Sequence, residues 1–161
     1  MDSRINQVES LFSEWDSSDR PGAVLAIVQN GRPVYTEAFG MSSIEHGIVI
    51  DNETRFRIAS VSKQFLVTVV MLLVQEGKIA LDEDIRTYDP ELPDFGKVVT
   101  VRHALSMNSG MRDFLDILDW SGAGLERPVA DSDIRDFLLR QRKLNYTPGE
   151  MFIYTNTGYR L

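Results

Sequence analysis

The apolar segment between residues 60 and 75 constrains the fold of this chain more than any other part of its sequence. It begins at Ser60, continues through Gln75 and is followed by Gly77, a residue type that commonly ends helices in the left-handed conformation. Apolar side chains at this density, bounded in this way, predict a helix over residues 60–75. No apolar run in the chain approaches the roughly 20 residues that a membrane span needs, so we expect no membrane span.

The residues before this helix have a different pattern. Apolar residues at helical spacing predict a first helix over 5–15, and a cluster of turn-forming residues follows it. The apolar run 23–29, the dipeptide Asn30-Gly31 and the returning segment 32–40 predict a β-hairpin. Because a two-stranded ribbon is marginal alone, we expect further strands to come from elsewhere.

The rest of the chain is predicted to be poor in strands. Residues 41–59 are expected to be loop-like with short extended pieces, and the region from 60 to about 145 to be mostly helical. Thr100 is a predicted N-cap of a short helix that runs through Met107. Apolar spacing predicts another amphipathic helix around 134–141.

Together these segments predict an α/β fold of the α+β type, in which an antiparallel sheet is flanked by helices and joined to a mainly helical region. Residues 1–59 would supply the N-terminal helix and hairpin, and residues 60–161 the long helix and the mainly helical region. At residues 158–161 a helix starts, with no capping residue or polar tail behind it. We therefore expect the remaining C-terminal part of the fold to be absent from this chain.

Charge and residue usage exclude several classes of function. The net charge is -7 and the acidic residues are scattered, so nucleic acid is not an expected partner. There is no cysteine, which excludes disulfides and thiolate sites, and His46 and His103 are the only histidines. We expect no metal and no cofactor. The first residues lack a basic region followed by an apolar stretch, so a cytoplasmic location is expected unless a signal peptide has been removed.

Ser60 and Lys63 form the first candidate site. At positions i and i+3 of a helix, both side chains would lie on one face a single turn apart. A serine hydroxyl needs a base within hydrogen-bond reach to become a good nucleophile, and a lysine amine can serve as that base. The alternative is an N-cap serine beside a solvated lysine, and this pair alone favours that alternative.

Tyr154 and Asn156 form the second candidate site. Two residues apart in an extended segment, their side chains point the same way. The phenol could relay a proton to a leaving group while the amide holds a substrate carbonyl. The alternative is a half-buried aromatic residue and a turn asparagine.

The order and spacing of four blocks resemble the class C β-lactamase superfamily of serine hydrolases, which includes penicillin-binding proteins, D-alanyl-D-alanine carboxypeptidases, D-aminopeptidases and carboxylesterases. The likeness runs from about residue 20 to the end of the chain. The four blocks span residues 56–65, 76–84, 100–111 and 147–159.

The resemblance implies that Ser60 is the nucleophile that forms an acyl-enzyme, Lys63 its base, Tyr154 a proton relay and Asn156 a substrate contact. The Ser60 backbone N–H would be one oxyanion donor, but the family's third motif, which lines the other side of the cleft, is not in these residues. The segment 108–114 is more similar to the D-aminopeptidase branch. The substrate would be a small amide, peptide or ester, and a complementary C-terminal half would be a second chain.

Two other classes remain open. One is a penicillin-binding or sensing protein that keeps an acylable serine and has negligible turnover. The other is an interaction module without chemistry, in which Ser60 only caps a helix. His46 and His103 are expected to be structural or surface residues, since the resemblance already supplies the bases.

Overall fold

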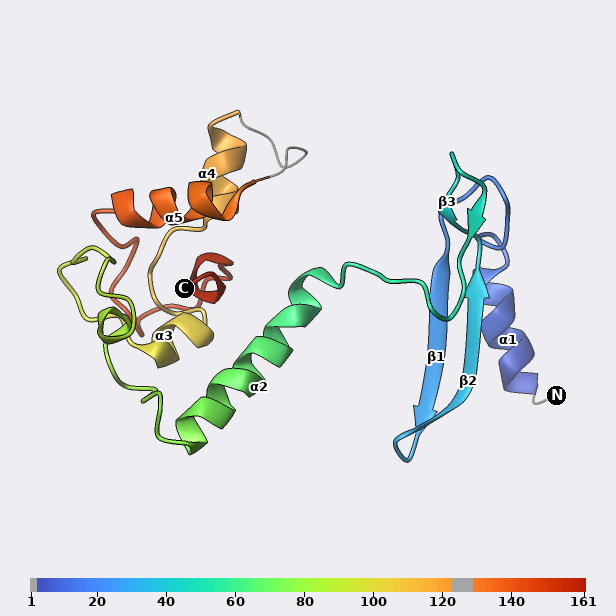
Figure 1. The fold of residues 1–161 in the computed structure, drawn as a ribbon, viewed down its shortest axis with the longest axis horizontal. Coiled ribbons are helices and arrows are strands. Elements are labelled where there is room, and N and C mark those ends of the chain that lie inside the picture. The colour runs from blue at the N-terminus through green and yellow to red at the C-terminus, as the bar shows by residue number, and fades with distance from the viewer. Residues whose placement is uncertain (1–2, 123–128) are drawn as a thin grey trace. The chain divides into compact units, whose positions relative to one another are not determined.

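The computed structural model describes residues 3–122 and 129–161. The chain forms two compact units, Met1–Arg57 and Ile58–Leu161, and each is described by itself (Figure 1). The first unit contains the strands and the second contains most of the helices. Small antiparallel sheets and a mainly helical region agree with the predicted fold class.

The first unit is built on a helix and a hairpin. Helix α1 spans Ser3–Phe12, and strands β1, Ala23–Gln29, and β2, Arg32–Phe39, pair antiparallel as predicted. At the turn, Asn30 has φ 52° and Gly31 has φ 73°, and two positive φ angles in succession are typical of a type I′ hairpin. The backbone twist of that turn matches the twist of the strands, which explains why this dipeptide connects them.

Helix α1 is shorter than predicted. The apolar spacing continues to Trp15, but the helix ends at Phe12, and a turn closes where the Trp15 N–H donates to the Phe12 carbonyl at 2.9 Å. The Phe12 ring then stacks on Phe39 of β2 at 5.0 Å, and Trp15 meets it edge-on at 5.3 Å. Packing of these rings against the hairpin satisfies the apolar side chains without a further helical turn.

A second small sheet follows the hairpin. Strands β3, Met41–Ser43, and β4, Ile48–Val49, are the short extended pieces within the segment predicted to be loop-like. Phe39, Met41 and Ile50 are buried and give this unit a small core.

The second unit consists of short helices around one apolar core. Its elements are η1 (Ala59–Val61), α2 (Ser62–Gln75), η2 (Ile85–Thr87), α3 (Val101–Leu105), α4 (Phe114–Trp120), α5 (Asp131–Arg140) and η3 (Thr157–Tyr159). The buried apolar residues that form the core are Ile85, Leu92, Phe95, Val99, Ala104, Met111, Phe114, Ile134 and Leu138.

Three predicted boundaries in this unit were wrong by a turn or less. The helix expected from Ser60 begins as an α-helix at Ser62, after the 3-10 turn η1 that carries Ser60. Helix α3 ends at Leu105, before Met107, whose φ of 56° cannot continue a helix. The helix expected to start at 158–161 is the 3-10 turn η3.

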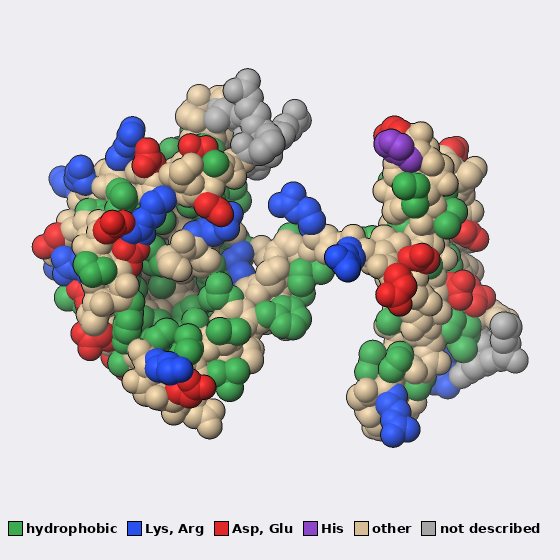
Figure 2. Space-filling model, viewed as in Figure 1, with side chains coloured by type: hydrophobic (Ala, Val, Ile, Leu, Met, Phe, Trp, Pro, Cys, Tyr) green, Lys and Arg blue, Asp and Glu red, His purple; other side chains and the backbone are tan. Residues whose placement is uncertain are grey.

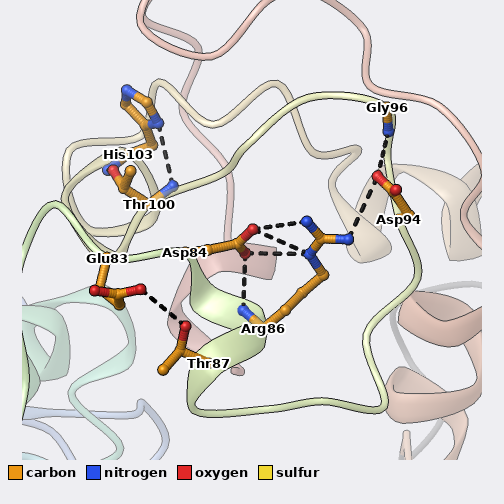
Figure 3. Close-up of polar contacts among 8 residues, drawn as sticks. All are labelled: Glu83, Asp84, Arg86, Thr87, Asp94, Gly96, Thr100 and His103. Carbon is orange, nitrogen blue, oxygen red and sulfur yellow. Dashed lines mark hydrogen bonds and ion pairs between the residues drawn. The ribbon is translucent and has the colours of Figure 1, made fainter.

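Polar contacts fix the connection between η2 and α3 (Figure 3). The Arg86 guanidinium binds Asp84 at 2.7 Å and Asp94 at 3.4 Å, and its hydrogen bonds to Asp84 lower the pKa of that carboxyl. Thr100 caps α3 as predicted, because its hydroxyl accepts from the His103 N–H at 3.1 Å. The Thr100 N–H in turn donates to His103 Nδ1 at 3.2 Å, which gives this histidine a structural contact.

Helix α2 carries a continuous exposed apolar face. Val61, at the end of η1, and Phe65, Val69 and Leu72 of α2 recur every three or four residues, so they lie on one side, and each is more than half exposed. Figure 2 shows apolar side chains gathered along this part of the second unit. None of the α2 residues, all of which the structure describes, is buried. Among the described residues, no helix has both the length and the apolar character needed to cross a membrane.

Candidate active site

Ser60 lies in the 3-10 turn that leads into α2, and Lys63 lies in the first turn of that helix. The Lys63 Nζ donates to Ser60 Oγ at 2.9 Å. Ala59, just before the serine, has φ 45°, a left-handed conformation that is unfavourable for a residue with a Cβ. The tight turn thus presents the hydroxyl on the same side as the amine one turn later.

Tyr154 and Asn156 come from the segment between Gly149 and η3. The Tyr154 and Ser60 hydroxyls are 2.5 Å apart, and Lys63 Nζ donates to Tyr154 Oη at 2.7 Å. The same amine donates to Asn156 Oδ1 at 2.8 Å. All four residues singled out in the sequence therefore lie in one hydrogen-bonded group, although the two pairs are about 90 positions apart.

Backbone hydrogen bonds hold the second half of this group in place. The Gly149 N–H donates to the Asn108 carbonyl at 2.8 Å, and the Ile153 N–H donates to the Met107 carbonyl at 3.1 Å. Gly158 in η3 lies against α3 so closely that an added Cβ would be 2.8 Å from the Ala104 carbonyl oxygen. The segment is thus anchored along the loop that follows α3.

The electrostatics of the group centre on the lysine. The hydrogen bond from Lys63 lowers the pKa of Tyr154, and the contact with Ser60 lowers it further. The Lys63 Nζ also lies 4.8 Å from the centre of the Tyr154 ring and 5.4 Å from that of Tyr159. Three oxygen acceptors and two ring faces therefore surround a single amine.

The group can move protons between its members. Ser60, Lys63 and Tyr154 are in mutual hydrogen-bond contact, so a proton can pass among hydroxyl, amine and phenol without a bridging water. Tyr154 is 48% exposed, and Ser60 is also exposed, so a substrate can reach both oxygens. No group of three or more histidine, aspartate or glutamate side chains that could hold a metal occurs in residues 3–122 and 129–161.

Three residues that contact this group or the segment that carries it were given no functional role in the sequence analysis. Asp113 accepts from Asn156, Thr157 ties the same segment to residues 112 and 114, and Tyr159 donates to the Leu105 carbonyl at 2.6 Å. Burial raises the pKa of Tyr159. The available signal was Asp113 directly before an apolar helix, a typical N-cap, but that signal does not reveal a contact with residue 156.

A family model described as β-lactamase matches residues 8–161. The chain belongs to the β-lactamase family. It is 29% identical to penicillin-binding protein 4* of Bacillus subtilis (strain 168) over 157 residues, which is 96% of this chain and 34% of the relative. It is also 29% identical to a D-aminopeptidase of Brucella anthropi over 141 residues, 88% of this chain and 26% of the relative. This β-lactamase-family chain thus spans about a quarter to a third of the length of the curated relatives it matches.

Solved structures give the same family relationship. The octameric penicillin-binding protein homologue from Pyrococcus abyssi superimposes with a TM-score of 0.79 at 29% identity, over 99% of this chain and 37% of that one. The D-amino acid amidase from Ochrobactrum anthropi SV3, complexed with L-phenylalanine, gives a TM-score of 0.73 at 28% identity, over 97% of this chain and 42% of that one. The hydrolase EstCE1, described as having promiscuous acyltransferase activity, gives 0.74 at 25% identity, over 96% and 43%.

Proposed function

We propose that this chain carries the nucleophile-bearing part of a serine hydrolase that acts through an acyl-enzyme on a small amide, peptide or ester. The observation that carries the proposal is the mutual contact of Ser60, Lys63 and Tyr154, with no pair more than 2.9 Å apart. A solvated lysine beside a capping serine would have no reason to share its amine with a tyrosine from a distant segment. Membership of the β-lactamase family supports the same chemistry.

Acylation begins at the serine. Lys63 takes the Ser60 proton while Oγ attacks the substrate carbonyl carbon. The carbonyl oxygen becomes an oxyanion, and the backbone N–H of Ser60 is one donor to it. The second donor would come from the part of the fold beyond these residues.

Breakdown of the tetrahedral intermediate uses the tyrosine. Tyr154 passes a proton to the leaving amine or alcohol as its bond to the carbonyl carbon breaks, and Lys63 returns a proton to the phenol. A water molecule then attacks the Ser60 ester, and release of the acid restores the hydroxyl. Asn156 contacts the substrate and holds the amine of Lys63 in the group.

The substrate class follows from the relatives. A D-aminopeptidase, a D-amino acid amidase and a hydrolase with acyltransferase activity are among the similar proteins, which supports a small acyl compound as substrate. The similarity of residues 108–114 to the D-aminopeptidase branch favours an amide or peptide within that class.

The site is proposed to need a complementary C-terminal half. The exposed apolar face of α2, formed by Val61, Phe65, Val69 and Leu72, is what a helix in the interior of a larger fold presents. This chain matches about a third of each of these relatives, so the unmatched part of each relative is about twice as long as this chain. The complementary half would cover this face and supply the second oxyanion donor.

Intact-mass spectrometry after incubation with a fluorophosphonate tests this function, on the chain alone and mixed with the C-terminal half of a relative. We expect one adduct at Ser60, absent in Ser60→Ala and retained in Ser62→Ala, a matched change two residues away. An adduct only in the mixture would support the shared site. No adduct in either sample would overturn the proposal and favour an interaction module.

Turnover separates the hydrolase from a penicillin-binding or sensing protein. A penicillin adduct at Ser60 should disappear with time as water hydrolyses the ester, which a mass-spectrometric time course follows. A permanent adduct with every acyl donor would favour the sensing protein.

A further inference from the structure

Asp113 stands directly behind the amide of Asn156. Its Oδ2 accepts from the Asn156 backbone N–H at 2.5 Å and from the side-chain Nδ2 at 3.0 Å. Its Oδ1 accepts from the Leu115 N–H at 2.7 Å and caps helix α4. A single carboxylate thus joins the start of a helix to a member of the candidate active site.

This contact determines which way the Asn156 amide points. An amide side chain can offer either its oxygen or its NH₂ group in the same place, but a carboxylate only accepts hydrogen bonds. The NH₂ group of Asn156 must therefore face Asp113, and Oδ1 must face Lys63, where it accepts from Nζ at 2.8 Å. With the amide reversed, the NH₂ group would oppose the donor of Lys63.

Next to Asp113, hydrogen bonds of Thr157 also join the segment before α4 to the segment that carries Asn156. The Thr157 hydroxyl accepts from the Phe114 N–H at 3.0 Å and donates to the Arg112 carbonyl at 2.6 Å. Thr157 is fully buried. The backbone around Asn156 is therefore held by Thr157 as well as by Asp113, and the contact with the side-chain NH₂ group is the one that orients the amide.

We propose that Asp113 is a positioning residue of this active site, acting through Asn156 to hold the amine of Lys63 between Ser60 and Tyr154. The inference rests on the proposed function for its effect on rate, but not for its effect on the Asn156 amide. Lys63 has three acceptors, and Asn156 Oδ1 is the one that lies outside the Ser60–Tyr154 pair. Loss of that acceptor leaves the amine free to turn to solvent.

The variant Asp113→Asn separates this role from the capping of α4. Asparagine caps helices about as well as aspartate, so its oxygen can still accept from Leu115. Its NH₂ group would then face the NH₂ group of Asn156, where no hydrogen bond can form. Asp116→Asn is the matched control, because Asp116 is an exposed carboxylate in the first turn of the same helix.

The first measurement is the rate of fluorophosphonate labelling at Ser60. It is made on the chain alone or on its mixture with the C-terminal half, depending on which of the two is labelled in the unchanged protein. Misplacement of a catalytic group by about 1 Å costs on the order of 100-fold, so we expect labelling of Asp113→Asn to fall by about 10- to 100-fold. Asp116→Asn should label like the unchanged protein. Equal rates for all three would overturn the proposal while leaving the serine hydrolase intact.

Two spectroscopic measurements are independent of labelling. The Asn156 side-chain NH₂ resonances should move in Asp113→Asn and stay in place in Asp116→Asn; unmoved resonances would overturn the proposal even if the unchanged protein failed to label. The hydrogen bond from Lys63 is the largest cause that lowers the pKa of Tyr154, whereas the charge of Asp113 raises that pKa slightly. If the amine turns away in Asp113→Asn, absorbance at alkaline pH should therefore show Tyr154 titrating higher, whereas loss of the Asp113 charge alone would move it lower.

Discussion

Helices α2 and α5 use their apolar residues in opposite ways. Helix α5 is mostly polar, yet its Ile134 and Leu138 are only 3% and 1% exposed in the core of the second unit. Helix α2 is mostly apolar, yet Phe65 is 60% exposed and Leu72 is 54% exposed. The helix with fewer apolar residues is thus the one that buries apolar side chains within its own unit.

The difference teaches that the apolar content of a helix does not tell where its partner lies. Helix α5 meets its partners within the unit and contributes to its stability. Helix α2 carries Lys63 in its first turn and has an apolar face that the described residues of its own unit leave uncovered. Substitutions in α2 should therefore change chemistry and association, whereas substitutions in α5 should change folding.

The largest expected effect is on chemistry at the start of α2. Replacement of Lys63 by methionine removes the base while keeping an unbranched side chain of similar reach. Labelling of Ser60 should fall by about 10²- to 10⁴-fold, the usual contribution of a positioned general base. Lys78→Met is the control, since Lys78 pairs with Glu76 on the surface. Undiminished labelling in Lys63→Met would contradict the role of the lysine.

The same variant has a second readout in the titration of Tyr154. The hydrogen bond that Lys63 donates favours the phenolate, and it is the largest cause that holds the pKa of Tyr154 below its usual range. Removing that donor removes the stabilisation of the phenolate, so the pKa of Tyr154 should rise in Lys63→Met. Ultraviolet absorbance against pH measures it, and Tyr154→Phe identifies which transition belongs to Tyr154.

Much of the fold could be predicted because its signals are local. Asn30-Gly31 predicted the hairpin turn and Thr100 the cap of α3, since both depend on the conformation of neighbouring residues. The predicted end of α1 was wrong because Trp15 contacts Phe12 from a turn after the helix. Periodicity reports only the spacing of apolar residues, and a turn can bring the same apolar side chains into contact as a helix does.

The site shows the same division between local and distant signals. The spacing of Ser60 and Lys63 is one helical turn, so their contact follows from local geometry once a helix is assumed. Their meeting with Tyr154 spans about 90 residues and was inferred only from the resemblance to a family. The contact of Asp113 with Asn156 had neither a local pattern nor a family motif behind it.

The comparison of the helices can be tested on one pair of leucines. Leu138→Ala should lower the free energy of unfolding by about 2–5 kcal/mol, because it leaves a cavity in the core. Leu72→Ala makes the same chemical change on the exposed face of α2 and should cost less than about 1 kcal/mol. Urea unfolding followed by circular dichroism measures both. Similar losses would show that α2 contributes as much packing energy to this unit as α5 does.

A smaller effect is expected on association. Phe65→Ser removes the largest side chain from the exposed face of α2, and burial of a phenylalanine contributes about 2 kcal/mol, or roughly 30-fold in Kd. Calorimetry with the complementary half should show that weakening, with little change in the stability of the chain itself. Trp120→Ser is the control, because Trp120 is 78% exposed but lies in α4. Equal weakening by both would argue against α2 as the contact face.

The smallest expected effect concerns how the two helices begin. Neither has a side-chain N-cap, but Ala130, before α5, has φ -73° and ψ 149°, the extended conformation from which a cap can reach the first turn. Val61, before α2, has φ -60° and ψ -26°, which is already helical because η1 leads directly into the helix. Ala130→Ser should therefore raise the free energy of unfolding by about 1 kcal/mol, whereas Val61→Ser should add nothing. Urea titrations of the two variants measure the difference, and a gain from Val61→Ser would mean that α2 starts afresh at Ser62 instead of continuing from the turn that holds Ser60.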